Sequence, residues 1–229
     1  MIETPAHDEL RELLEAAGVE AALVEPLARF GGRVLETNRR FNLTGAKTAA
    51  GLAPHIVDSL TVVPFVREPY VDIGSGGGFP AIPVAIATRV RVTMIETTVK
   101  KANFLRETLE LFGLSGEVIA ERAEVADHDE RLRGRFASGT ARAVSSAPTV
   151  AELLLPLIET GGVAILQRRN DEERERQALD DASLMLGGTI ESETELGDGR
   201  RIVLVRKTGP TQIRFPRRTG IPEKRPLCL

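Results

Sequence analysis

Residues 70–80 read Tyr-Val-Asp-Ile-Gly-Ser-Gly-Gly-Gly-Phe-Pro, and this stretch decides the fold. A short run rich in β-branched residues ends in a loop with four glycines, and an apolar segment typical of a helix follows. Glycine lets the backbone turn tightly and approach a ligand closely. Pro80 suits the second position of that helix, where no backbone donor is needed. The pattern predicts a small-molecule site at the carboxyl end of a strand, where doubly wound sheets bind ligands.

Beyond this loop, strands and helices alternate. The strands are expected at Tyr70–Ile73, Val90–Glu96, Gly116–Glu121, Phe136–Val144, Gly162–Gln167, Thr189–Leu196 and Arg201–Arg206. The helices between them are expected at Phe79–Arg89, Val99–Gly113, Thr149–Thr160 and Asp171–Leu186. This alternation predicts a doubly wound, Rossmann-like α/β fold with a mostly parallel sheet. Gly197-Asp198-Gly199 is a tight polar turn, so the last two strands are expected to form an antiparallel hairpin.

The chain is expected to divide into a helical segment at 1–65, a core at 66–208 and a basic tail at 209–229. Leucines at three- and four-residue spacing predict the amino-terminal helices. Four prolines in the last twenty residues make a regular element unexpected in the tail.

Charge is distributed unevenly along the chain. Residues 200–229 hold nine of the 30 Lys and Arg residues but one of the 33 acidic residues, Glu223. Because phosphate backbones respond to a local basic patch, this ending is expected to be an extended arm that binds RNA. Its removal is then expected to leave cofactor affinity almost unchanged. The alternatives are a solvated basic tail, or a tail that folds back over the cofactor cleft and closes it.

Composition excludes several classes of protein. A chain with 42% hydrophobic and 28% charged residues is typical of a soluble globular protein. One cysteine and three scattered histidines predict neither a disulfide nor a metal site. The amino terminus lacks the pattern of a signal peptide, and no apolar run is long enough to span a membrane. We expect a cytoplasmic protein, without a metal or a membrane partner, that acts as a monomer.

The glycine loop is compatible with more than one ligand. Gly76-x-Gly78-x-x-Ala81, with Glu96 about twenty residues on, satisfies the dinucleotide fingerprint, so an NAD-dependent oxidoreductase stays open. Asp72 argues against it, because a pyrophosphate gains nothing from a nearby carboxylate. S-adenosylmethionine carries a sulfonium and an ammonium but no phosphate, so it suits an acidic loop better. Glu96 would accept hydrogen bonds from both ribose hydroxyls; its alternative role is a helix cap.

Two other kinds of site fail on the same residues. A phosphate-binding P-loop requires Lys and Ser or Thr after its last glycine, whereas Phe79 and Pro80 follow here. A hydrolase elbow requires glycine two residues before its serine, a position that Ile73 occupies. His55, Asp58 and Ser59 contain the letters of a catalytic triad, but they are expected to share one helical turn and to be structural.

Five motifs occur in order along residues 38–226. They are Asn42-Leu43-Thr44, His55–Leu60, Asp72–Pro83, Arg122-Ala123-Glu124 and Thr140–Val144. With the basic, proline-rich ending, these motifs resemble the RsmG (GidB) methyltransferases. That family transfers a methyl group from S-adenosylmethionine to N7 of one guanine in bacterial small-subunit (16S) ribosomal RNA. The resemblance therefore implies a class I methyltransferase core that acts on ribosomal RNA or its ribonucleoprotein particle.

The resemblance also implies roles for individual residues. Gly74 and Phe79 would line the cofactor, Ala123 and Glu124 would meet its adenine side, and Arg142 would border the methyl-transfer pocket. Together with the loop and the two acidic residues, the expected cofactor site comprises Asp72, Gly74, Gly76, Gly78, Phe79, Glu96, Ala123, Glu124 and Arg142.

The expected RNA contacts are basic side chains. They are Arg39, Arg40, Lys47, Arg142, Arg168, Arg169, Arg214, Arg217, Arg218, Lys224 and Arg225. The family usually has Lys-Gly where this chain has Gln167-Arg168, so Arg168 or Arg169 is expected to replace that lysine.

No catalytic acid or base is expected, because guanine N7 carries a free lone pair and loses no proton when it attacks a methyl group. Catalysis can rest on alignment, which supplies ~7 to 11 kcal/mol in favourable cases. A non-catalytic RNA-binding protein with a vestigial cofactor pocket is the remaining alternative.

Overall fold

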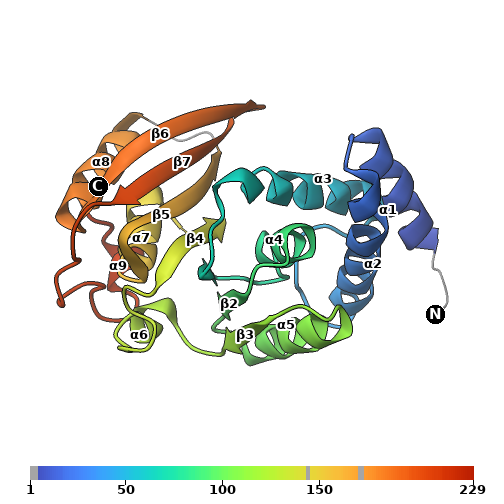
Figure 1. The fold of residues 1–229 in the computed structure, drawn as a ribbon, viewed down its shortest axis with the longest axis horizontal. Helices are drawn as coiled ribbons and strands as arrows, with labels where there is room; N and C mark the ends of the chain where they lie inside the picture. The colour runs from blue at the N-terminus through green and yellow to red at the C-terminus, as the bar shows by residue number, and fades with distance from the viewer. Residues whose placement is uncertain (1–4, 143–144, 170–172) are drawn as a thin grey trace.

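The computed structural model describes residues 5–142, 145–169 and 173–229 (Figure 1). Within these residues, seven strands form one sheet with the order β3-β2-β1-β4-β5-β7-β6. Their bounds are β1 Tyr70–Ile73, β2 Val92–Ile95, β3 Gly116–Ile119, β4 Phe136–Arg142, β5 Ile158–Arg169, β6 Gly188–Gly197 and β7 Arg200–Lys207. Strands β1 to β5 pair in parallel, whereas β7 pairs antiparallel with β5 and with β6. The predicted doubly wound sheet with a terminal hairpin is confirmed.

The helices alternate with these strands. Their bounds are α1 Pro5–Ala16, α2 Ala21–Asn38, α3 Ala49–Leu60, α4 Ala81–Thr88, α5 Val99–Leu111, α6 Ala123–Ala126, α7 Ala147–Leu154, α8 Glu173–Met185 and α9 Ile221–Lys224, with a 3₁₀ turn at Val63–Phe65. In the described part of the chain, no helix has the length and apolar character that crossing a membrane requires.

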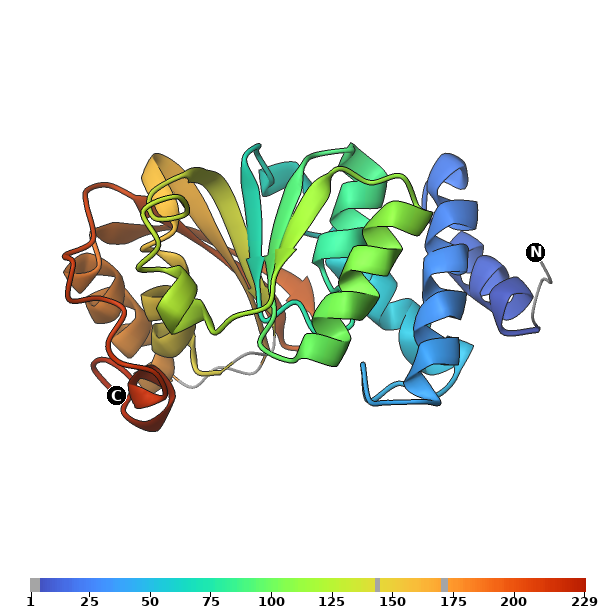
Figure 2. The ribbon, with the colours of Figure 1, turned by 90° about the horizontal axis from the view of Figure 1, so that it is seen from below.

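The sheet has a hydrophobic core on each face, and Figure 2 shows helices on both sides of the sheet. Successive side chains of a strand point to opposite faces, so Tyr70 belongs to one core and Val71 to the other. Helices α1 to α5 contribute to the first core, while α6, α7, α8 and the tail contribute to the second. Because β1 is buried on both faces, the loop that follows it rests on a rigid base.

The predicted helix at Thr149–Thr160 is too long. Helix α7 ends at Leu154, and β5 begins at Ile158. Pro156 explains the difference, because proline has no backbone N–H to continue the helical hydrogen bonds. Two other predicted bounds, Val144 and Asp171, lie outside the described residues.

The expected extended arm is wrong, because the tail folds back onto the second face of the sheet. Phe215, Pro222 and Leu227 are buried, and the tail contains the short helix α9. Arg133 donates hydrogen bonds from its guanidinium to the carbonyls of Thr211, Gln212 and Phe215 at 2.9–3.1 Å. The prolines prevent a long helix, but apolar residues of the tail still pack against the second face of the sheet.

A buried ion pair fixes the middle of the tail. Glu152 of α7 is completely buried, and both of its carboxylate oxygens accept hydrogen bonds from the guanidinium of Arg217 at 2.6–3.1 Å. The backbone N–H of Arg217 donates to the same carboxylate at 2.8 Å. Removing one partner of such a pair leaves an uncompensated charge, which costs far more than losing an exposed ion pair.

Replacing Arg217 with methionine should therefore lower the free energy of unfolding by about 3 kcal/mol. The neighbouring exposed residue provides the control, since Arg218→Met should change it by no more than about 0.5 kcal/mol. Urea unfolding of both variants measures the difference. Equal stability of the two variants would show that the tail is not held by this pair.

Candidate active site

The glycine loop is held between β1 and β2. Gly74, Gly76 and Gly78 adopt positive φ angles of 66°, 54° and 92°, which favour glycine. The N–H of Gly74 donates to the carbonyl of Ile95 at 2.8 Å, and the N–H of Gly78 donates to that of Ser75 at 2.7 Å. The loop is thus a fixed turn at the carboxyl end of the strand, as predicted. Pro80 differs from the expectation only in preceding α4 as its N-cap.

Asp72 lies buried beneath this loop. It pairs in register with Thr140 of β4, whose hydroxyl donates to Asp72 Oδ1 at 2.6 Å. Because that hydroxyl has one proton to give, the neighbouring Tyr70 hydroxyl, 2.5 Å away, must donate to Thr140. The other carboxylate oxygen, Oδ2, is buried without a hydrogen-bond partner. The chain of hydroxyls therefore fixes the carboxyl group and leaves one oxygen for a ligand.

Electrostatics favour a cation at this position. Burial, the largest cause, raises the pKa of Asp72 to about 7. This pKa also reflects hydrogen bonds to Ser75 and Thr140 and the positive charge of Arg142, which lower it, and the negative charge of Glu96, which raises it. A ligand with a positive charge would stabilise the ionised form, and the sulfonium and ammonium of S-adenosylmethionine meet that requirement.

Glu96 connects the glycine loop to the start of α5. Its Oε2 accepts from the N–H of Gly76 at 2.8 Å, and its Oε1 accepts from the N–H of Thr98 at 2.7 Å. The bond to Thr98, the N-cap of α5, agrees with the alternative role of Glu96 as a helix cap. Ribose binding would use the same carboxylate. Each oxygen keeps a second lone pair, so binding of ribose hydroxyls stays a prediction.

Ala123 and Glu124 lie on the short helix α6, after β3. Glu124 is buried, and its Oε1 accepts a hydrogen bond from the N–H of Gly220 in the tail at 2.8 Å. The tail is thus bonded to a residue expected on the adenine side of the cofactor. Because Gly220 and Glu124 are far apart in sequence, the sequence gave no indication of this contact. The expectation that removal of the tail leaves cofactor affinity almost unchanged therefore loses its basis.

Arg142 is the last residue of β4 and lies over the ring of Phe79, with its guanidinium carbon 5.1 Å from the ring centroid. It also donates to the carbonyl of His55 at 3.2 Å and approaches Asp58 Oδ2 at 3.5 Å. Arg142 therefore forms an ion pair with a carboxylate from α3. The structure brings two of the predicted residues, Phe79 and Arg142, together at the end of the sheet.

Asp58 is the residue whose importance the sequence did not reveal. Besides Arg142, its carboxylate accepts from Arg200 of β7 at 3.0 Å and from the Gln167 amide of β5 at 3.2 Å. These partners are 84, 109 and 142 residues away in sequence, and no short motif links them. One carboxylate thus ties the amino-terminal helices to three strands and fixes the direction of Arg142.

The other basic residues fall into separate groups. Arg39, Arg40 and Lys47 are exposed around the turn of residues 42–47. A Cβ added at Gly77 would lie 3.3 Å from the carbonyl of Leu43, so this turn packs against the glycine loop.

The two candidates for replacing the family lysine differ. Arg168 forms an ion pair with Glu175 at 2.5 Å and donates to the carbonyl of Ser145 at 2.8 Å, whereas Arg169 is exposed. Of the predicted tail contacts, Arg214, Arg218, Lys224 and Arg225 are exposed, while Arg217 is occupied by Glu152.

The strand order, the acidic glycine loop after β1 and the second carboxylate after β2 define a class I methyltransferase sheet. The chain belongs to the family described as rRNA small subunit methyltransferase G, whose family model matches residues 24–203.

Curated relatives support this assignment. A protein of Rubrobacter xylanophilus called ribosomal RNA small subunit methyltransferase G is 34% identical, over 99% of this chain and 93% of that protein. A protein of the same name from Deinococcus deserti is 37% identical, over 96% of this chain and 97% of its own.

Solved structures show the same fold at low sequence identity. Mitomycin 7-O-methyltransferase MmcR aligns with a TM-score of 0.56 and 16% identity, covering 90% of this chain and 69% of that chain. The ribosomal protein L11 methylase of Lactobacillus delbrueckii aligns with a TM-score of 0.53 and 14% identity, covering 69% of this chain and 80% of that chain.

The raised pKa of Asp72 generates a pH prediction. Only the ionised carboxylate attracts a cation, so the affinity for S-adenosylmethionine should rise up to about tenfold per pH unit below 7 and then level off. Calorimetric titration from pH 5.5 to 8.5 measures this, and Asp72→Asn controls for titration of the cofactor itself. The variant should bind more weakly and without the rise. A wild-type affinity that does not change with pH would contradict the role of Asp72.

The same group affects stability with a defined sign. A carboxyl whose pKa is higher in the folded state binds its proton more tightly there. The free energy of unfolding should therefore fall as pH rises from about 4 to about 7. Asp72→Asn should remove this part of the pH dependence in urea unfolding. An unchanged slope in the variant would mean that another group causes it.

Proposed function

We propose that this chain transfers a methyl group from S-adenosylmethionine to N7 of a guanine in small-subunit ribosomal RNA. The observation that carries the proposal is the unpartnered, buried Oδ2 of Asp72 beneath the glycine loop. Family membership supports the reaction class, and the names of the curated relatives support ribosomal RNA as the substrate. Because that substrate is found in the cytoplasm, the proposal places the enzyme there, acting as a monomer.

The residues present fit this cofactor. Asp72 faces the positively charged end, Glu96 offers free lone pairs to the ribose, and Ala123 with Glu124 borders the adenine. Gly74 and Gly76 let the backbone approach, because neither carries a side chain in the loop. When bound, S-adenosylmethionine supplies a methyl group on a positively charged sulfur.

The reaction balances without a proton transfer. The lone pair of N7 forms a bond to the methyl carbon, the bond between that carbon and sulfur breaks, and its electron pair stays on sulfur as a neutral thioether. The positive charge passes to the guanine ring. The enzyme must therefore align three atoms rather than remove a proton.

Arg142 is placed to position the base. A planar guanidinium can donate two parallel hydrogen bonds, so it can hold guanine O6 or an adjacent phosphate. A second cation beside a ring that becomes positive would be unfavourable, but Asp58 offsets the charge of Arg142. Phe79 beneath the guanidinium limits its movement.

The two alternative functions fit the structure less well. An NAD-dependent oxidoreductase would bring a pyrophosphate towards Asp72, whose carboxylate repels it. A vestigial pocket does not require the hydroxyl chain that fixes Asp72 or the bond from Glu96 to the loop. The intact arrangement favours a working cofactor site.

A matched pair of glycine substitutions tests the cofactor site. Gly74 and Gly134 have nearly equal φ angles of 66° and 63°, so leucine is similarly strained at both positions and should cost about 1 kcal/mol of stability. Gly74→Leu should weaken S-adenosylmethionine binding by more than about tenfold, because its side chain enters the ligand space, whereas Gly134→Leu should not. Calorimetry decides, and wild-type affinity in Gly74→Leu would remove the loop from the site.

A pH–rate profile tests the reaction. With saturating cofactor, the single-turnover rate should be nearly flat between about pH 6.5 and 8.5, because no protein base titrates. A steep dependence on one pKa near 7 that disappears on replacing one side chain would reveal a general base. That result would assign the methyl group to a different acceptor atom.

Asp58 is expected to act through Arg142. Asp58→Asn keeps the size of the side chain but removes the charge, so kcat should fall by about tenfold or more while S-adenosylmethionine affinity stays within twofold. Arg200→Gln breaks another bond of Asp58 without touching Arg142, and it should retain most of kcat. Equal losses of kcat in both variants would show that Asp58 has a structural role only.

A further inference from the structure

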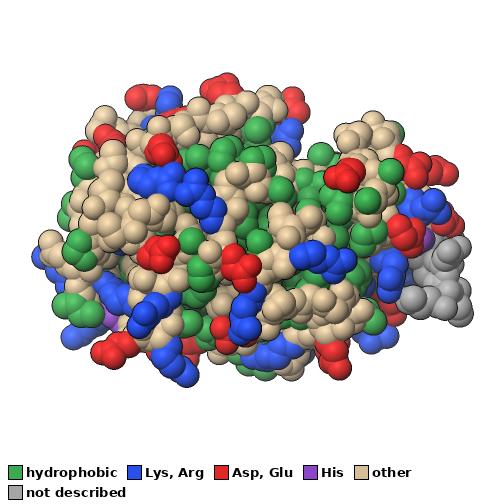
Figure 3. Space-filling view, viewed as in Figure 1, with side chains coloured by type: hydrophobic (Ala, Val, Ile, Leu, Met, Phe, Trp, Pro, Cys, Tyr) green, Lys and Arg blue, Asp and Glu red, His purple; other side chains and the backbone are tan. Residues whose placement is uncertain are grey.

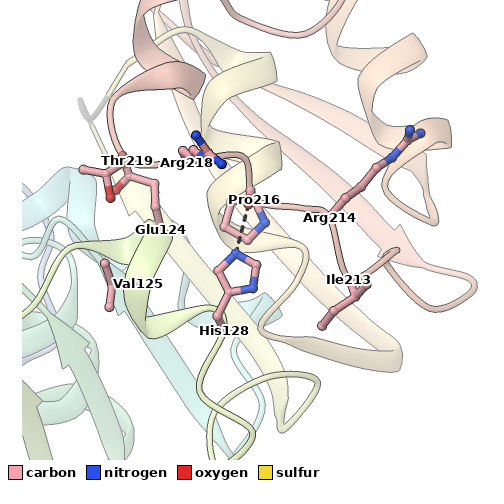
Figure 4. Close-up of a pocket in the computed structure, with 8 residues that line it drawn as sticks. All are labelled: Glu124, Val125, His128, Ile213, Arg214, Pro216, Arg218 and Thr219. Carbon is pink, nitrogen blue, oxygen red and sulfur yellow. Dashed lines mark hydrogen bonds between the residues drawn. The ribbon is translucent and has the colours of Figure 1, made fainter.

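The tail and α6 border an open pocket that shares one residue, Glu124, with the predicted cofactor site. Its volume is about 500 Å³, and its lining residues are Glu124, Val125, His128, Ile213, Arg214, Pro216, Arg218 and Thr219. Figure 4 shows Glu124 and Val125 on one side, Ile213 and Arg214 on the other, and His128 with Pro216 between them. The pocket is therefore formed by two segments that are far apart in sequence.

Apolar side chains are exposed in this pocket. Among the described residues, seven large hydrophobic side chains are exposed, and two of them line it: Val125 at 47% and Ile213 at 75%. Leaving such surface in water is unfavourable, and a cluster of it indicates a binding site. The aliphatic walls suit a flat, uncharged ring.

Positive charge surrounds the same space. Arg214 and Arg218 line the pocket within the most basic part of the chain, and Figure 3 shows Lys and Arg side chains gathered over this end of the molecule. The Arg214 guanidinium lies 5.0 Å from the centroid of the Phe215 ring. His128 Nε2 must donate to the carbonyl of Pro216, 3.0 Å away, so in a neutral ring Nδ1 is an acceptor. The pocket thus combines apolar walls, an acceptor and the cationic Arg218, while the guanidinium of Arg214 lies at its edge and points away from His128 in Figure 4.

The pocket is also held in shape. The Arg217–Glu152 pair, the bonds from Arg133 to three tail carbonyls and the bond from Gly220 to Glu124 all fix the tail that forms one wall. A site fixed in advance loses less conformational entropy when a ligand binds.

We propose that this pocket binds one unpaired nucleotide of the RNA substrate. The base contacts Val125 and Ile213, while Arg214 and Arg218 hold its phosphates. This inference rests on the proposed function and adds a second point of contact to it, next to the adenine side of the cofactor. Unpaired nucleotides suit such a pocket, because specific recognition of RNA relies on bases that are not stacked in a helix.

Two aspartate substitutions provide the test. Ile213→Asp places a carboxylate in the pocket, whereas Leu111→Asp makes the same change at an exposed position of α5, 52% exposed, at the other end of the sheet. Binding of a small-subunit ribosomal RNA transcript should weaken by about tenfold in the first and less than twofold in the second. Affinity for S-adenosylmethionine should be unchanged in both, which shows that the fold is intact.

A second pair of variants tests the phosphate contact. Arg218→Gln should reduce the slope of log K against log salt by about 0.7, whereas Arg91→Gln, also exposed but directly before the first residue of β2, should not. Equal RNA affinity of Ile213→Asp and Leu111→Asp would overturn the proposal. The proposal would also be overturned if Ile213→Asp lost affinity for free guanosine monophosphate but not for RNA. That result would make the pocket a site for a free mononucleotide.

The pocket proposal and the proposed function can fail separately. If Ile213→Asp binds RNA like the control and the wild type still methylates it, the pocket proposal is wrong and the proposed function stands. If the wild type binds RNA through the pocket but transfers no methyl group, the proposed function is wrong instead.

Discussion

A carboxylate buried without a full set of partners is the constraint on which this site depends. Asp72 sits at the end of a strand that is covered on both faces, where ionisation is costly unless a positive charge is near. Tyr70 and Thr140 satisfy one of its oxygens and hold the other beneath the glycine loop. The fold thus maintains an unfavourable group at the place where a cationic cofactor would relieve it, and the loop, Glu96 and Arg142 are arranged around that place.

The N-terminal helices and the tail serve this centre from opposite faces of the sheet. Asp58 on α3 reaches across the end of the sheet to Arg142, Gln167 and Arg200. On the other face, Glu124 and Glu152 hold the tail through Gly220 and Arg217. Both attachments use carboxylates with low exposure, which are costly to leave unpaired. The parts outside the sheet are therefore bound to it by charge as well as by apolar burial.

Much of this arrangement could be predicted from the sequence, because it follows from local rules. Alternating strands and helices predict the parallel sheet, and the residues that end β1 and β2 are predicted to meet at one edge. The bond between Asp72 and Thr140 could not be predicted, since it requires knowing which strands are neighbours and in what register. The role of Asp58 was hidden for the same reason. The tail was misjudged because its charge predicts exposure, whereas the distant Glu152 pairs with Arg217 and the apolar residues Phe215 and Leu227 are buried.

The central claim is that one chain holds S-adenosylmethionine and delivers its methyl group to a ribosomal guanine. Mapping N7-methylguanine along small-subunit ribosomal RNA from cells that lack the protein tests it most directly. The account predicts that one guanine loses its methyl group, that the wild-type protein restores it, and that Arg142→Gln does not. An unchanged pattern of N7-methylguanine in the deficient cells would contradict the account.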